Sequence, residues 1–281
     1  MKYLTLIVAL SMLSASPVFA QEGKSNSILN NLNEIYGEKY ELDSASSVWK
    51  KDLKLQRYLN YYYLNKPVYL TPQMMARLVE LGYMDQKPEE QNYAIGFFAV
   101  LFKQNPQALR GWLDQLNVTQ YQAGAFIRAA RYAGLGSIAK DWATTKQWSY
   151  GVPKEGEDGP FSNLTLPIED DIDTAEAVQR IWGGYAVSGE KVYLDRLFDT
   201  LLITDVPLNQ VEINKGEYGS FMKRALNELL EGLLINAAVQ YNDVYEYLAQ
   251  KADDPALQTN MQMRRIVMKA MREREKASAN Q

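Results

Sequence analysis

The 281-residue sequence contains no histidine and no cysteine. Without them the chain can form neither a Ser-His-Asp triad nor a Cys-His pair, and it lacks the nitrogen and sulfur ligands of ordinary zinc sites. Thiol redox chemistry and disulfide bonds are excluded for the same reason. Any catalysis would have to rely on carboxylates, Lys, Tyr, Ser or Thr.

The chain also has no excess of positive charge. It carries 30 Lys and Arg against 34 Asp and Glu, a formal net charge of −4. Nucleic acids and anionic lipid surfaces are bound through clustered positive charge, so this balance argues against both as partners. We also expect no cofactor and no bound metal.

Long apolar runs are absent except at the start of the chain. Residues 1–20 have the three parts of a signal peptide: Lys2, the apolar run 4–13, and a small-residue cleavage site that ends at Ala20. The apolar run is shorter than the ~20 residues that a membrane-spanning helix needs, which disfavours an uncleaved anchor. We therefore expect a periplasmic or secreted protein with no transmembrane span after signal removal.

The rest of the sequence is a succession of helix patterns. Thr71-Pro72, Asn105-Pro106 and Thr119 are helix-start signals, and Gly82 is a stop signal. In the second half, apolar periodicity predicts helices near 171–188, 190–203, 216–237, 242–252 and 255–276. These patterns predict an all-α fold.

Residues 151–167 interrupt the helical pattern with Gly, Pro and charged residues. A loop of this length in a compact chain is either functional or a linker. We interpret it as a linker between an N-terminal helical half, 21–150, and a C-terminal half, 168–281. No 34-residue repeat period is present. The expected architecture is an irregular α-solenoid or a multi-helical bundle of antiparallel helix pairs.

Two helix junctions carry a resemblance to other proteins. Residues 181–193, IWGGYAVSGEKVY, place a Trp-Gly helix end before a tight turn and a Tyr-led helix. Residues 236–244, NAAVQYNDV, form the second junction. Both resemble junctions in uncharacterised exported all-helical proteins of bacteria. The resemblance implies export and a helical fold, and it implies no activity.

Two further patterns have structural explanations. The acidic residues Glu169, Asp170, Asp171 and Asp173 could attract a cation, but acids are favoured at the helix start expected there. The Ser-x-x-Lys pattern of penicillin-interacting enzymes occurs at Ser47–Lys50, Ser137–Lys140 and Ser220–Lys223. Because its companion motifs are missing, we interpret all three as chance.

An enzyme that cleaves cell-wall glycan would need a carboxylic acid in an apolar cleft. Glu80, Glu228 and Glu231 are the buried-looking candidates, although the spacing of Glu228 and Glu231 among leucines favours the polar edge of a core helix. A glycosidase-type enzyme with a Glu or Asp acid is therefore one alternative function, and a secreted effector is another.

The favoured hypothesis is a non-catalytic binding or scaffolding module of the cell envelope, with another envelope protein or a peptide as its partner. The expected contact surface comprises Tyr61, Tyr62, Tyr63 and Tyr69, together with the loop 151–160. Tyrosine suits such surfaces because its ring is large and amphipathic. Ordinary helix packing of the same tyrosines is the competing interpretation. The sequence leaves the oligomeric state open.

Overall fold

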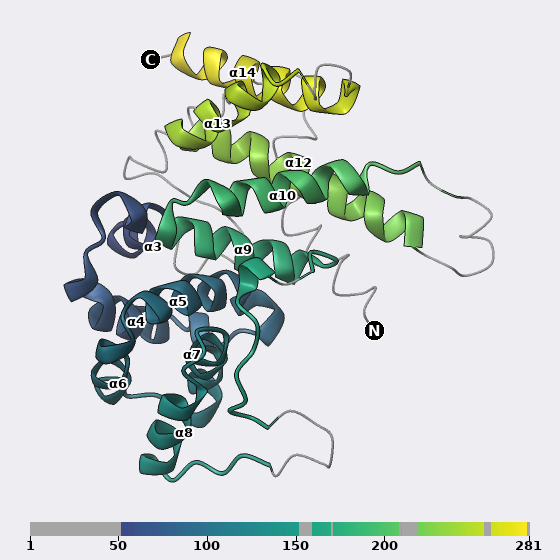
Figure 1. Ribbon diagram of the computed structural model, residues 1–281. Helices are drawn as coiled ribbons and strands as arrows, with labels where there is room; N and C mark the ends of the chain where they lie inside the picture. The colour runs from purple at the N-terminus through teal and green to yellow at the C-terminus, as the bar shows by residue number, and fades with distance from the viewer. Residues whose placement is uncertain are drawn as a thin grey trace. The chain divides into compact units, whose positions relative to one another are not determined.

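The computed structural model describes residues 52–151, 159–169, 171–207, 209, 219–255 and 260–279 (Figure 1). These residues form eleven α-helices with four short 3₁₀ turns between them, and they contain no strand. The predicted all-α class is confirmed. The expected signal peptide, 1–20, lies outside the described residues.

The internal contacts of the chain define two compact units. The first, here called the N-terminal unit, contains Ala45–Ile172 and Glu176–Tyr193. The C-terminal unit contains Asp173–Ala175 and Leu194–Gln281. The expected boundary at 151–167 differs from this division, which falls near residue 193.

Helix α5 forms the centre of the N-terminal unit. The helices of this unit are α3 (Leu53–Asn65), α4 (Thr71–Glu80), α5 (Asn92–Gln104), α6 (Pro106–Asp114), α7 (Gln120–Tyr132), α8 (Gly136–Thr145) and most of α9 (Ala175–Ser188). Every α5 residue from Ala94 to Phe102 is buried. The α5 rings of Phe98 and Phe102 stack, and Phe98 also meets Phe126 of α7 edge to face.

Two glycines let α5 and α9 cross at close range. A Cβ on Gly96 of α5 would overlap the carbonyl oxygen of Arg180 and would lie 2.5 Å from its Cα. A Cβ on Gly183 of α9 would lie 2.7 Å from the backbone nitrogen of Phe97. Beside this crossing, the Arg180 guanidinium donates a 3.0 Å hydrogen bond to Asn92 Oδ1. These contacts explain why α9 belongs to the N-terminal unit although it follows the 151–167 loop.

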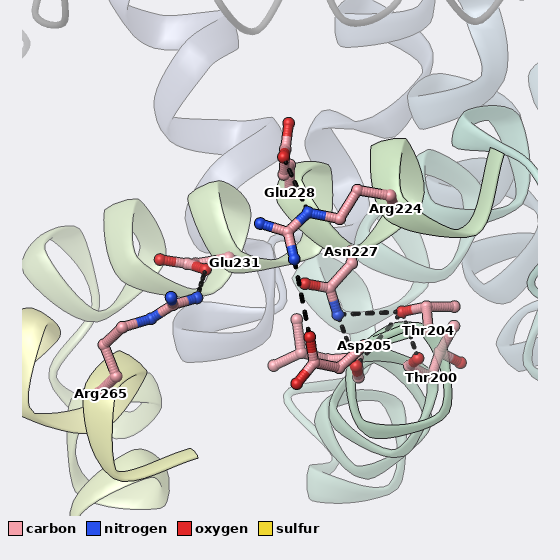
Figure 2. A network of polar contacts seen from close by, with 9 residues as sticks. Thr200, Thr204, Asp205, Arg224, Asn227, Glu228, Glu231 and Arg265 are labelled. Carbon is pink, nitrogen blue, oxygen red and sulfur yellow. Dashed lines mark hydrogen bonds and ion pairs between the residues drawn. The ribbon is translucent and has the colours of Figure 1, made fainter. Parts of the chain in front are cut away.

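In the C-terminal unit, α12 contacts both of the helices that follow it. The unit contains most of α10 (Lys191–Thr204), with α12 (Gly219–Gln240), α13 (Asn242–Ala252) and α14 (Met261–Ala279). A buried amide joins α12 to α10: Asn227 Nδ2 donates to the Leu201 carbonyl at 2.7 Å and to Thr204 Oγ1 at 3.2 Å (Figure 2). Because a buried polar group without a partner is destabilising, this amide fixes the register of the two helices.

Buried tyrosines predict a loss of stability at alkaline pH. Burial raises the pKa of Tyr62 and of Tyr193 from 10.0 to about 12. The folded state therefore keeps these protons at a pH where the unfolded chain releases them. This stabilisation is complete below pH 10 and should be lost as the pH rises from about 10 to about 12.

Urea unfolding monitored by circular dichroism across this pH range would measure the loss. Tyrosinate absorbance supplies the control, because the native protein should ionise fewer tyrosines near pH 11 than the unfolded chain does. Equal tyrosinate absorbance in the two states would contradict the prediction.

Candidate functional site

A pocket of about 760 Å³ lies beside α8 in the N-terminal unit. Its walls come from three stretches of chain: one face of α8, the residues directly after that helix, and residues 159–163. The side chains that define its chemistry are Ser137, Lys140, Thr144, Trp148, Tyr150, Phe161 and Asn163. Its volume is within the ~300–1,000 Å³ that is usual for small-ligand sites.

Hydrogen bonds to the backbone hold one wall of the pocket in place. The Gly136 backbone N–H, at the start of α8, donates to Asn163 Oδ1 at 2.9 Å. Arg131 of α7 donates from Nε to the Ser162 carbonyl at 2.7 Å, and its own carbonyl accepts from the Leu164 N–H at 2.9 Å. Residues 162–164 are thus anchored to the end of α7 and the start of α8.

Ring contacts fix the aromatic part of the pocket. Trp148 meets Trp142 edge to face, with ring centroids 4.9 Å apart, and Trp142 is completely buried. Tyr150 and Phe161 form a second edge-to-face pair at 5.0 Å. Such pairs contribute ~0.5–1.5 kcal/mol beyond the area that they bury. The pocket therefore presents rings that are already held in position.

Several polar groups of the pocket have unused hydrogen-bonding capacity. The Tyr150 hydroxyl is buried and has no hydrogen-bond partner among the described residues, and burial raises the pKa of this tyrosine. An unpaired buried hydroxyl is unfavourable by ~1–3 kcal/mol. Lys140 is exposed and forms no ion pair within the described chain. A ligand that bonds to the Tyr150 hydroxyl would satisfy it, and an anionic ligand beside Lys140 would gain an ion pair.

One of the Ser-x-x-Lys patterns lies in this pocket. Ser137 and Lys140 both line it, but no hydrogen bond joins the hydroxyl to the ammonium group. Of the other two pairs, Ser47–Lys50 lies outside the described residues. In the third, the Ser220 hydroxyl accepts a hydrogen bond from the backbone N–H of Asn209. The structure thus brings a pair that we attributed to chance into the pocket wall, without the contact that an activated serine requires.

The structure divides the predicted tyrosine surface. Tyr62 was wrongly predicted as a contact residue: it is 1% exposed, and its ring packs edge-on against two other core rings. Tyr63 is partly buried, 5.7 Å from the Tyr185 ring, and Tyr61 lies at a kink in α3. Tyr69, 83% exposed, is the one that projects fully into solvent. A contiguous surface of four tyrosines therefore does not form.

Two of the three candidate acids are exposed, which disfavours them as buried acids. Glu80 is 63% exposed and is 3.0 Å from Arg77, one turn earlier in α4. Glu228 is 54% exposed and is 3.0 Å from Arg224 in α12 (Figure 2). Both lie on the solvent face of an amphipathic helix, as the spacing of Glu228 among the leucines of its helix predicted.

Glu231 is the most buried of the three acids, at 15% exposure of its side chain. It bridges α12 to α14, because its carboxylate is 2.8 Å from the Arg265 guanidinium (Figure 2). The Lys269 ammonium, also on α14, is 3.5 Å from the same carboxylate. Both cations come from the facing helix, and the carboxylate lies between the two helices instead of facing a cleft. The arrangement fits a structural ion pair between helices.

The described ranges contain neither a cluster of metal ligands nor a helix that could span a membrane. No group of three or more acidic side chains there is arranged to hold a metal ion. Glu169, Asp171 and Asp173 belong to those ranges, while Asp170 lies outside them. None of the described helices is both long and apolar enough to cross a membrane.

The residues of the pocket were largely missed by sequence reasoning. The loop 151–160 was predicted as a contact surface, and it borders the pocket at Gly151 and at 159–160. Trp148, Tyr150 and Phe161 flank that loop, so the available signal was an aromatic residue on either side of a Gly- and Pro-rich segment.

Comparisons with protein-family models, with curated proteins and with solved structures found no match to this chain.

Proposed function

We propose that this protein is an exported, non-catalytic binding module of the cell envelope, and that the pocket beside α8 is its binding site. The observation that carries the proposal is the pocket itself: fixed aromatic rings beside an unpaired Tyr150 hydroxyl and an unpaired Lys140. Preorganised rings with a few convergent polar groups are typical of ligand sites. Export rests on the signal-peptide pattern of residues 1–20.

The ion pairs of the candidate acids support a non-catalytic role over a glycosidase. The acid of a glycosidase lies in an apolar cleft that holds the sugar. Glu80, Glu228 and Glu231 each have an Arg within 3.0 Å. A binding module needs no such acid.

The shape of the pocket also bears on the partner. Protein–protein interfaces bury ~800 Å² on each side over a broad surface. A concave site of about 760 Å³ is instead suited to a small ligand or to one segment of a polymer. The expected envelope partner would then contact the protein through such a segment.

Site-specific photo-crosslinking tests this proposal. The full chain would carry a benzophenone amino acid in place of Thr144, an exposed residue of the pocket, in cells that produce it. We expect one recurrent adduct in the envelope fraction, because a bound ligand would lie against this position.

The matched control carries the same group at Gln107, an exposed residue of α6 outside the pocket lining. The adduct should be absent there, and it should be lost from position 144 when Trp148 is changed to Ala. Equal adducts at 144 and 107, or none at 144, would refute the proposal.

A further inference from the structure

We propose that the pocket beside α8 binds a sugar that carries a carboxylate, with the sugar ring against Trp148 and the carboxylate near Lys140. This inference rests on the proposed function and names the ligand class of the same site.

The first step is the mixture of ring faces and small polar groups. A pyranose has an apolar C–H face and an edge of hydroxyl groups, so it needs an aromatic surface beside hydrogen-bonding groups. The pocket offers both: the Trp148 and Phe161 rings are half-buried in its wall, and Ser137, Tyr150 and Asn163 supply hydroxyl and amide groups. A purely apolar ligand would leave the polar groups unsatisfied.

The second step is the hydrogen-bonding capacity that remains in this wall. Asn163 uses its Oδ1 to accept from the Gly136 N–H, which leaves its NH₂ group available as a donor. The Tyr150 hydroxyl can donate or accept, and it has no partner among the described residues. Hydroxyl groups of a sugar, which both donate and accept, match such a set.

The third step is charge. Lys140 is the one charged side chain in the described lining, which contains no carboxylate. It forms no ion pair within the described chain, so its charge is available to a ligand. A carboxylate on the sugar supplies the complementary charge.

A peptide is the competing ligand, and the structure favours it less. Extended peptides commonly bind by adding a strand to a sheet edge, and the described residues contain no strand. Proline-rich peptides do bind aromatic grooves, but they contribute carbonyl acceptors and no donors from proline. The Tyr150 hydroxyl could bond to such a carbonyl, whereas Lys140 would gain no anionic partner. An acidic proline-rich peptide is therefore included in the test.

The test is an NMR titration of the protein with four probes at low ionic strength. The first two are the disaccharide of N-acetylglucosamine and N-acetylmuramic acid, and N,N′-diacetylchitobiose, which has two similar rings but no carboxylate. The third is a uronic-acid disaccharide, and the fourth is the acidic proline-rich peptide. We expect at least one acidic disaccharide to bind about two- to fivefold more tightly than chitobiose, the range of one exposed ion pair. Which acidic sugar binds tells a cell-wall source from a uronic-acid polysaccharide.

Lys140→Gln should abolish this preference, so that the variant binds the acidic disaccharide no more tightly than chitobiose. Lys103→Gln, at an exposed lysine of α5 outside the pocket lining, is the matched control and should keep the preference. Trp148→Ala should weaken all sugar binding by roughly tenfold. Because Trp148 also packs on Trp142, the circular dichroism and melting temperature of the Trp148→Ala protein are measured in parallel. If that variant unfolds, the Lys140→Gln variant still tests the proposal, because its change is at an exposed side chain.

Equal binding of acidic and neutral sugars by the parent protein would overturn the assignment of a carboxylate. Binding of the peptide alone, or of no probe, would overturn the assignment of a sugar as the ligand. If the titration fails in this way but an adduct still forms at position 144 in the crosslinking experiment, the sugar inference is refuted and the proposed function stands. If neither experiment gives a signal, both are refuted.

Discussion

Replacing Gly96 by Ala should destabilise the N-terminal unit by about 3 kcal/mol, the upper part of the usual range for overpacking. The added methyl group would overlap the backbone of Arg180 in α9, and a backbone cannot rotate away as a side chain can. The two helices would have to separate, which opens space around the buried residues of α5. Urea unfolding followed by circular dichroism would measure the change.

A second glycine in the same unit provides the control. Gly124 lies within α7, and a Cβ there would meet nothing within 4 Å. Gly124→Ala should therefore stabilise the protein by about 0.5–1 kcal/mol, because alanine loses less backbone entropy in a helix. Changes of opposite sign in the free energy of unfolding would show that the loss at Gly96 comes from the helix crossing and not from the helix propensity of alanine.

The partner glycine across the crossing tests the same contact. Gly183→Ala should also destabilise, and the double variant with Gly96→Ala should cost less than the sum of the two, since one separation of the helices relieves both overlaps. Strict additivity would show that the two positions act independently, contrary to the geometry.

Much of the local structure could be predicted from sequence because it is encoded locally. Thr119 forms the expected cap: its hydroxyl accepts from the Gln122 N–H, and the Gln122 side chain accepts from the Thr119 N–H. Gly82 follows α4 in the left-handed conformation, with φ of 74°, as its stop signal predicted. Each signal depends on residues within four positions of one another.

Other local signals were overridden by distant contacts. Thr71 begins α4 as expected, but its hydroxyl is buried and shares a 2.7 Å hydrogen bond with Tyr58 of α3 instead of capping the helix. The Asn105 side chain likewise makes no cap for α6; its amide donates to Leu101 of the preceding helix. Sequence spacing cannot show which tertiary partner will compete for a capping side chain.

The unit boundary and the pocket were harder to predict for the same reason. The Gly96–Gly183 crossing joins residues far apart in the chain, so the helices before and after residues 151–167 belong to the same unit. The pocket combines α8 with residues on both sides of that loop. An irregular loop gives a sequence signal, but the residues that it brings together do not.

The second large effect on stability is expected for Tyr62 of α3, with the exposed Tyr69 of the following 3₁₀ turn as its comparison. Tyr62→Ala should destabilise the protein by about 3–5 kcal/mol, as for other buried aromatic residues, because it removes a ring that contacts both Tyr58 and Phe97. Tyr69→Ala should change stability by no more than about 0.5 kcal/mol, because that side chain is exposed. Urea unfolding of the two variants would give both values.

This difference determines how a tyrosine contact surface must be tested. A triple change of Tyr61, Tyr62 and Tyr63 to Ala would carry at least the destabilisation expected for Tyr62→Ala, so a loss of binding would not distinguish a lost contact from a lost fold. We expect Tyr69→Ala to stay folded, so this variant tests the surface contact alone. Tyr62→Phe keeps the buried ring and is the control for packing. If Tyr62→Ala left the stability unchanged, its ring would not lie in the core, and the four tyrosines could again form one surface. If Tyr62→Ala destabilises the protein as expected and Tyr69→Ala leaves the adduct at position 144 intact, binding at the pocket beside α8 does not require an exposed tyrosine at position 69.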